Sequence, residues 1–172
     1  MKYRPIIFSA PMVRAILDGR KTQTRRVVSA RDIRKRGTCV HGNMTLVCGC
    51  QPQYWGSGPY GVPTDRLWVR ERIDYIGDGV SVYAADLTPT PAEGWHWRRD
   101  MLPAMFMPRG LSRITLEVTD VRVEHLQDIS ADDSVAEGAR EGFAALWDSI
   151  NPALPWRLNP FVWVVTFRRL EA

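Results

Sequence analysis

The stretch Ile16-Leu-Asp-Gly-Arg-Lys-Thr-Gln-Thr-Arg-Arg-Val-Val28 joins a short helix to a strand and gathers lysine, hydroxyl and arginine side chains where they meet. Upstream, apolar residues recur at helical spacing after a proline suited to a first helical position, so we expect a helix that ends at Gly19. The residue types that follow favour extended structure, which would place Thr24 and Arg26 on one face of a strand. Lys21 then lies at the hinge between helix and strand.

The proximity of Lys21 and Thr24 in the sequence suggests that the threonine hydroxyl is a nucleophile and the lysine is its base. A hydroxyl is a poor nucleophile unless a base takes its proton, and a lysine does so only when burial or nearby cations lower its pKa. Arg25 and Arg26 are such cations, and they could also hold an anion. The same composition is typical of a solvated, solubilising surface, so both interpretations stay open at this point.

The spacing Gly19-x-Lys21-x-x-x-x-Arg26 resembles the signature of the ASCH domain family, whose members have a small β-barrel related to the RNA-binding PUA fold. Residues 63–71, 113–124, 129–138 and 159–167 resemble, in that order, a phage and prophage branch of this family. The resemblance implies an α+β fold, a small mixed PUA-like barrel of about six strands with about three helices packed around it. It leaves out two insertions, at about 29–62 and 74–110, within one domain spanning residues 1–172.

The resemblance also implies catalytic residues. Some small bacterial ASCH proteins are amidohydrolases that remove the acetyl group from N4-acetylcytidine with a lysine, a threonine and a glutamate, which fall here on Lys21, Thr24 and Glu137. Thr24 would attack the acyl carbon, Lys21 would take its proton, and Glu137 would orient the lysine or activate water, with no cofactor required. Strand alternation puts Lys21 and Thr24 on opposite faces, so this mechanism needs a twist at the hinge.

We expect four further side chains to bind substrate: Arg25, Arg26, Glu71 and Trp68. Arg26 would hold the base or the developing oxyanion. Glu71 ends the apolar face of an expected strand over residues 65–72, so a buried carboxylate there needs a partner, for which Lys21 and Arg26 are the candidates. A structural salt bridge and a catalytic role both remain open for Glu71.

Two other functions compete with hydrolysis. A non-catalytic module that binds RNA or a modified base needs the same basic cleft and no reaction. An RNA-cleaving enzyme, a third class reported among relatives, would use Lys21 and Arg26 to stabilise a phosphorane, but no histidine lies near the motif. The chain lacks a nucleophile elbow, a Gly-rich phosphate loop and the zinc deaminase signature.

The distribution of charge favours RNA or a nucleoside as the partner. Nine of the 23 basic residues lie between Arg14 and Arg36, and arginine binds phosphates bidentately and stacks on bases. A GC-rich genome would explain many arginines but not their clustering. Trp95-His-Trp-Arg-Arg99 interleaves aromatics with arginines, as stacking on unpaired bases requires, although tryptophans also serve in cores and lids.

Four residues in the first insertion are candidate ligands of a structural zinc ion: Cys39, His41, Cys48 and Cys50. The single residue between the members of each pair is shorter than structural zinc sites usually have. A hairpin with small buried thiols is therefore the alternative interpretation.

The rest of the chain predicts an ordinary core. The parity of apolar residues changes near Thr119-Asp120, which predicts a bulge, and Ser130-Ala-Asp-Asp133 resembles a capping box at a helix start. Residues 161–167 are apolar on both faces, typical of a strand buried on both sides. A helical core stripe is formed by Phe143, Leu146, Trp147 and Ile150.

We expect a cytoplasmic protein that does not cross a membrane. No run approaches the ~20 apolar residues that a membrane span requires. The first residues lack the apolar run and cleavage site of a signal peptide. An odd number of cysteines, three, favours reduced thiols or metal binding over a disulfide framework.

Overall fold

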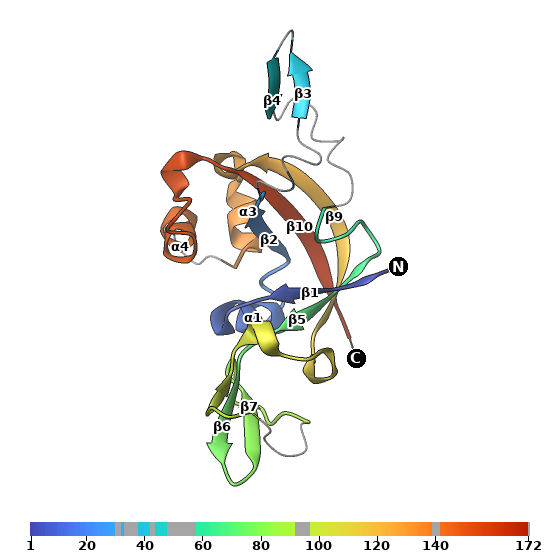
Figure 1. Ribbon diagram of the computed structural model, residues 1–172, viewed down its shortest axis with the longest axis vertical. Coiled ribbons are helices and arrows are strands. Elements are labelled where there is room, and N and C mark those ends of the chain that lie inside the picture. The colour runs from blue at the N-terminus through green and yellow to red at the C-terminus, as the bar shows by residue number, and fades with distance from the viewer. Residues whose placement is uncertain are drawn as a thin grey trace.

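The computed structural model describes residues 1–29, 32, 38–41, 44–47, 58–91, 97–138 and 142–171. For residues 38–41 and 44–47 only the backbone is described. Its largest unit is a five-stranded sheet with the strand order β1-β5-β9-β10-β2 (Figure 1). The bounds of these strands are β1 Tyr3–Ile7, β5 Arg66–Arg70, β9 Thr115–His125, β10 Phe161–Leu170 and β2 Gln23–Val27.

Smaller elements surround this sheet. The α-helices in the described part are α1 (Ala10–Leu17), α3 (Ala131–Ala136) and α4 (Phe143–Ile150), and none is long and apolar enough to cross a membrane. A three-stranded sheet holds β7 (Val80–Tyr83), β6 (Ile73–Gly77) and β8 (Met101–Leu102), and a hairpin holds β3 (Thr38–His41) and β4 (Met44–Val47). Short 3₁₀ turns are η2 (Ala104–Phe106), η3 (Arg109–Leu111), η4 (Leu126–Asp128) and η5 (Trp156–Leu158).

The five-stranded sheet is mixed and open. β1 runs parallel to β5, and the other neighbouring strands are antiparallel. Within the described residues, the edge strands β1 and β2 do not pair with each other, so the α+β class is confirmed but the expected barrel is not closed. A side chain connects the two edges where a backbone ladder is missing, because Arg26 Nη2 donates to the Ile7 carbonyl at 2.7 Å.

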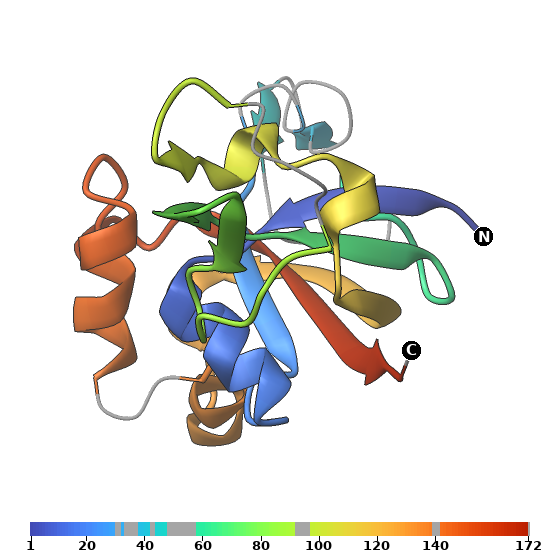
Figure 2. The same cartoon turned by 90° about the horizontal axis from the view of Figure 1, so that it is seen from below.

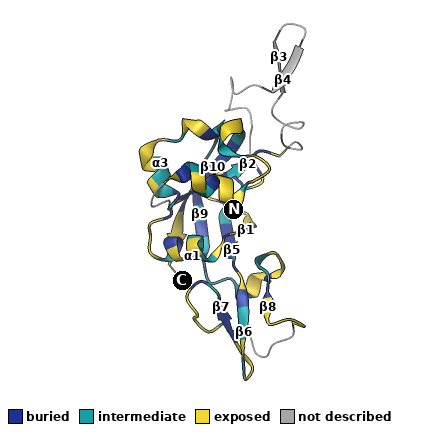
Figure 3. Ribbon diagram, turned by 90° about the vertical axis from the view of Figure 1, so that its left-hand side faces the viewer, coloured by how far each residue is buried: buried dark blue, intermediate teal, exposed yellow. Residues whose placement is uncertain are grey.

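The main core lies where α1 packs against the sheet. Val13 and Ile16 of α1 cluster with Leu67 and Val69 of β5 and with Val165 of β10. Buried positions follow the middle of β5, β9 and β10, whereas the outward sides of the helices are exposed (Figure 3). The helical spacing read from the sequence therefore identifies the face of α1 that packs inward.

β10 is buried on both faces, as the sequence predicts. Val162 and Val164 pack under α4 against Phe143 and Trp147, while the intervening side chains face the opposite way. The expected stripe on α4 is thus confirmed at its buried residues, but Ile150 at the end of the helix is exposed. Ile150 is the last residue of α4.

The predicted bulge is present in β9. Val118 pairs with Phe167 and Asp120 pairs with Thr166, so Thr119 has no residue opposite it on β10. A bulge raises the local twist, which lets two long strands bend around one core. The change of parity in the sequence has this cause.

The second expected insertion contains a small sheet with its own core. Ile73, Tyr83, Leu102 and Met107 are buried together, with Leu111 packed at the edge. This part of the chain therefore adds a second packed layer beside the five-stranded sheet.

We expect Leu116→Ala to lower the free energy of unfolding by about 2–5 kcal/mol, because Leu116 is fully buried in the main core and truncation leaves a cavity. Urea unfolding followed by circular dichroism measures this loss. Leu158→Ala is the control, since this exposed leucine should change stability by less than about 0.5 kcal/mol. Equal effects of the two substitutions would contradict the position of this core.

Candidate functional site

Lys21 lies between α1 and β2, with its side chain completely buried. Gly19 ends α1 with φ of 72°, and the Lys21 amide then donates back to the Ala15 carbonyl. Lys21 Nζ donates at 2.8 Å to each of three acceptors, the Gln23 carbonyl, the Glu137 carbonyl and Glu137 Oε2. These bonds use all the protons of the ammonium group.

Glu137 reaches Lys21 because of how α3 begins and ends. The Ser130 hydroxyl accepts from the Asp133 amide at 3.0 Å, so the predicted cap is confirmed. Gly138 follows the helix with φ of 80°, and a Cβ there would lie 3.3 Å from the Ala15 Cβ. A glycine at this position therefore allows the end of α3 to pack closely against the side chains of Ala15 and Lys21.

Arg25 of β2 is held by carboxylates, one of which is the Glu137 carboxylate that Lys21 also contacts. Its guanidinium donates to Glu124 Oε1 at 2.6 Å, to Asp133 Oδ2 at 2.8 Å and to Glu137 Oε1 at 3.2 Å. It also donates to Gln23 Oε1 at 2.5 Å. Both Nη atoms of the expected substrate ligand Arg25 are thus occupied by protein groups, which places Arg25 to position Glu137. Its buried Nε has no hydrogen-bond partner among the described residues.

One further arginine completes this network. Arg122 donates to Glu124 Oε2 at 2.9 Å and to Asp133 Oδ2 at 2.8 Å. Three cations, on Lys21, Arg25 and Arg122, therefore face the three carboxylates of Glu137, Asp133 and Glu124. Buried charges are tolerated when each is paired and hydrogen-bonded in this way.

The environment lowers the pKa of the Lys21 ammonium. Desolvation by burial is the largest cause, and Arg26 and Arg25 lower the pKa further by charge repulsion. The Glu137 charge and its hydrogen bond oppose this shift. A lysine with a lowered pKa is closer to the neutral form that accepts a proton.

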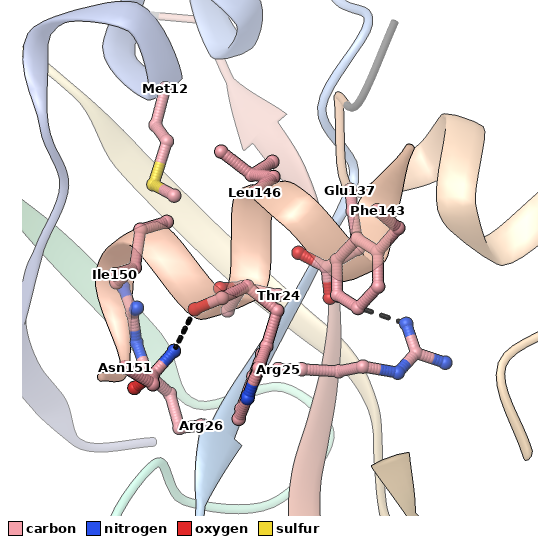
Figure 4. Close-up of a pocket in the computed structure, with 10 residues that line it drawn as sticks. Met12, Thr24, Arg25, Arg26, Glu137, Phe143, Leu146, Ile150 and Asn151 are labelled. Carbon is pink, nitrogen blue, oxygen red and sulfur yellow. Dashed lines mark hydrogen bonds and ion pairs between the residues drawn. The ribbon is translucent and has the colours of Figure 1, made fainter. Parts of the chain in front are cut away.

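Thr24 and Glu137 line the same small cavity beside α4, together with Arg26 and Phe143 (Figure 4). The cavity has a volume of about 20 Å³, enough for a water-sized group. The Thr24 side chain is almost fully buried, and its hydroxyl forms no hydrogen bond with any described residue. Lys21 does not line this cavity. Glu137 therefore connects the two residues, because it binds Lys21 and lines the cavity together with Thr24.

Arg26 lies at the gap between the sheet edges. In addition to its bond to Ile7, its guanidinium stacks over the Phe8 ring at 5.2 Å. Burial lowers the pKa of Arg26, with Tyr60 and Glu137 opposing the shift, but an arginine remains charged in this range. Arg26 is therefore a cation beside the cavity, as the sequence analysis expects of a substrate-binding group.

Glu71 and Trp68 lie elsewhere. The partner of Glu71 is Arg113, which contacts both carboxylate oxygens at 2.9 and 3.0 Å, so the expectation of Lys21 or Arg26 as its partner is wrong. The segment before β9 brings Arg113 to the end of β5, a contact that strand patterning does not encode. Trp68 points away from the main core and lies under the Arg70 guanidinium at 4.6 Å.

The candidate zinc ligands lie largely outside the described residues. Cys48 and Cys50 fall there, and Cys39 and His41 belong to β3, whose side chains are not described. In the ranges that are described, no group of three or more His, Cys, Asp or Glu side chains could hold a metal ion. The zinc site stays a prediction of the sequence.

Sequence reasoning missed the supporting carboxylates Asp133 and Glu124 and the cation Arg122. The sequence pattern indicates only a helix-capping role for Asp133. A usable signal exists in β9, where Arg122 and Glu124 alternate as opposite charges on one strand face. Their connection to Arg25 depends on tertiary packing.

We expect Lys21→Met to lower the free energy of unfolding by about 3–5 kcal/mol, because it removes one partner of a buried ion pair. Lys2→Met, at an exposed lysine, is the matched control and should stay within about 0.5 kcal/mol of the wild type. Chemical denaturation measures both. If Lys21→Met is as stable as the wild type, the Lys21–Glu137 pair does not support the fold.

We also expect acid to weaken the network through Asp133. Partial burial raises the pKa of this carboxyl, but hydrogen bonds from Arg25 and Gln23 outweigh that effect and leave the pKa below its ordinary value. Because the folded pKa is depressed, the contribution of Asp133 to stability is complete above about pH 5 and is lost at lower pH.

The change in unfolding free energy between pH 6 and pH 3, roughly the range in which carboxyls titrate, should therefore be smaller in Asp133→Asn than in the wild type. Asp132→Asn, at the exposed neighbouring carboxylate, is the control and should keep the wild-type pH dependence. An unchanged dependence in Asp133→Asn would contradict the role of this carboxylate.

No protein-family model and no curated protein matches the chain. Among solved structures, the ASCH domain from Lactobacillus crispatus is similar with a TM-score of 0.47 and 12% identity, over 98% of this chain and 79% of that one. A protein of the family model DUF984 from Enterococcus faecalis has a TM-score of 0.47 and 10% identity, over 99% and 81%. One of these structural neighbours is thus an ASCH domain, the family that the motifs of this chain resemble.

Proposed function

We propose that this protein is an ASCH-type amidohydrolase that acts on RNA or nucleosides in the cytoplasm and removes the acyl group from N4-acetylcytidine. The observation that supports it is the buried bond between Lys21 Nζ and Glu137 Oε2, with Glu137 and Thr24 lining one cavity. The family resemblance assigns the chemistry to these three residues. Their arrangement joins all of them through Glu137.

In this mechanism the Thr24 hydroxyl attacks the acyl carbon. The bond between the acyl carbon and the cytidine amine breaks, and water then releases the acyl group from Thr24. The proton of the attacking hydroxyl passes by way of the Glu137 carboxylate to Lys21 in its neutral form, which the lowered pKa of Lys21 favours, and the same route returns it to the departing cytidine amine. Arg26, beside the same cavity, stabilises the oxyanion. The reaction requires no cofactor.

The cavity must enlarge before a nucleoside can enter. Its present volume admits only a water-sized group, and Phe143, Leu146 and Trp147 of α4 form one wall. Substrate binding therefore requires α4 to move away from β2. The acyl group would then occupy the space between Thr24 and Glu137.

A second candidate function is a module that binds RNA or a modified base without reaction. Two observations favour this function: the cavity holds only a water-sized group, and all three protons of the Lys21 ammonium are donated to protein acceptors. Hydrolysis would require the cavity to enlarge and Lys21 to lose a proton first. The same basic residues would then hold the ligand. Turnover distinguishes the two functions.

We expect the purified protein to convert N4-acetylcytidine to cytidine and acetate, detected by chromatography. Thr24→Val removes the hydroxyl at nearly constant volume and should lower kcat by at least about 100-fold, the loss typical of a missing catalytic group. The matched control is Thr22→Val, at an exposed threonine two positions away that forms hydrogen bonds to the described residues only through its backbone.

Turnover lost in Thr24→Val and kept in Thr22→Val, with both variants folded, supports the proposal. A folded wild-type protein that does not hydrolyse the nucleoside contradicts it. Calorimetric binding of N4-acetylcytidine without turnover would then favour the binding module.

A further inference from the structure

The outward side of β1 and β5 carries rings and guanidinium groups in contact. Tyr3 and Arg66 lie opposite each other in the parallel pair, and Arg66 Nη1 donates to the Tyr3 hydroxyl at 2.7 Å. The Arg66 guanidinium lies 5.6 Å from the Tyr3 ring. Two residues further along β5, the buried Trp68 ring is covered by Arg70 of the same strand.

The segment that holds η2 and η3 extends this surface. Figure 2 shows these yellow turns beside β1 and β5. Arg70 Nη1 donates to the Met105 carbonyl of η2 at 3.0 Å, and Arg109 of η3 lies over the Tyr3 ring at 4.1 Å. Phe106, next to Met105, packs against Trp97 with ring centroids 5.5 Å apart. We call this surface the outer face, formed by Tyr3, Arg66, Arg70, Trp97, Phe106 and Arg109.

The outer face gathers exposed aromatic rings. Of the large apolar side chains that are exposed in the described residues, the aromatic ones are Tyr3 at 37%, Trp97 at 37% and Phe106 at 55%, and all belong to this face. A groove of about 620 Å³ runs beside Trp97 and Phe106, and Arg98 also lines it. Exposed rings beside a groove of this size offer flat surfaces to a ligand.

The arginines of the outer face are not neutralised. Arg66, Arg70 and Arg109 of this face have no carboxylate partner among the described residues, in contrast to Arg25 in the buried network. The same holds for Arg98, which lines the adjacent groove. The carboxylate nearest in register is Glu117, opposite Arg66, and Arg168 already contacts both of its oxygens. This surface therefore has an excess of positive charge that an anionic partner would complement.

We propose that the outer face binds an unpaired stretch of nucleic acid. The bases stack on Trp97, Phe106 and Tyr3, and the arginines contact the phosphates between them. Exposed rings alone would equally suit an apolar partner, and guanidinium groups alone would suit any polyanion. Their alternation within one face matches a chain in which flat bases alternate with charged phosphates. The function goes beyond hydrolysis, because none of these residues lines the cavity beside Thr24.

The test is fluorescence anisotropy with a labelled oligouridine of about ten nucleotides, within the usual site size of such proteins. Trp97→Ala and Phe106→Ala should each weaken binding by about 5- to 150-fold, the range for loss of one stacked base. Leu158→Ala, at an exposed apolar residue outside the face, is the control and should bind as the wild type does.

Arg98→Gln and Arg109→Gln should each reduce the slope of log affinity against log salt by about 0.7, because each removes one phosphate contact to a single strand. Arg157→Gln, at an exposed arginine on η5, is the control and should leave the slope unchanged. An abasic oligonucleotide of equal length should bind much more weakly than oligouridine.

Equal binding of the abasic strand, tighter binding of a duplex, or wild-type affinity in both aromatic variants would overturn the proposal. An acidic peptide that binds as tightly as the oligouridine would also overturn it and assign the face to a protein partner. The result does not depend on hydrolysis, since Thr24→Val should bind the strand normally. Trp97→Ala should in turn keep wild-type turnover of the free nucleoside if turnover exists.

Discussion

The burial of the Lys21 ammonium is the constraint on which the rest of the site depends. A charged group without water must have a hydrogen-bond acceptor for each proton and a nearby opposite charge, since an unpaired buried ion is very costly. Here the acceptors come from β2 and from the end of α3. The end of α1, the start of β2 and the end of α3 must therefore meet at one point, and Gly138 makes this approach possible.

The same bonds that stabilise this junction restrain its chemistry. Lys21 can serve as a base only in the neutral form, and that form gives up part of its bonding to Glu137. Arg25 and Asp133 behind the pair keep the Glu137 carboxylate in place while Lys21 changes its protonation state. In the proposed mechanism, Lys21 therefore influences both the stability of this junction and the turnover of the substrate.

The open sheet also determines where the cavity beside Thr24 and the outer face lie. The gap between β1 and β2 is spanned by Arg26, which leaves a cation and the Thr24 hydroxyl at an edge instead of inside a closed barrel. On the far side of β1, the added layer around β6 to β8 places η2 and η3 next to β5. The second insertion thus supplies half of the outer face, and none of its described residues lines the cavity beside α4.

The sequence by itself determined the elements and their inward faces: the end of α1 at Gly19, the bulge at Thr119, the cap at Ser130 and the double burial of β10. These depend on local backbone preferences and on apolar periodicity, which neighbouring residues set. The residue types of the candidate site, Lys21, Thr24 and Glu137, could also be identified from the motifs.

Only the tertiary structure decided their partners. Lys21 and Glu137 are 116 positions apart, and Glu71 and Arg113 are 42 apart. Any of several cations could have satisfied each buried carboxylate, so the choice was made by how the strands and helices pack.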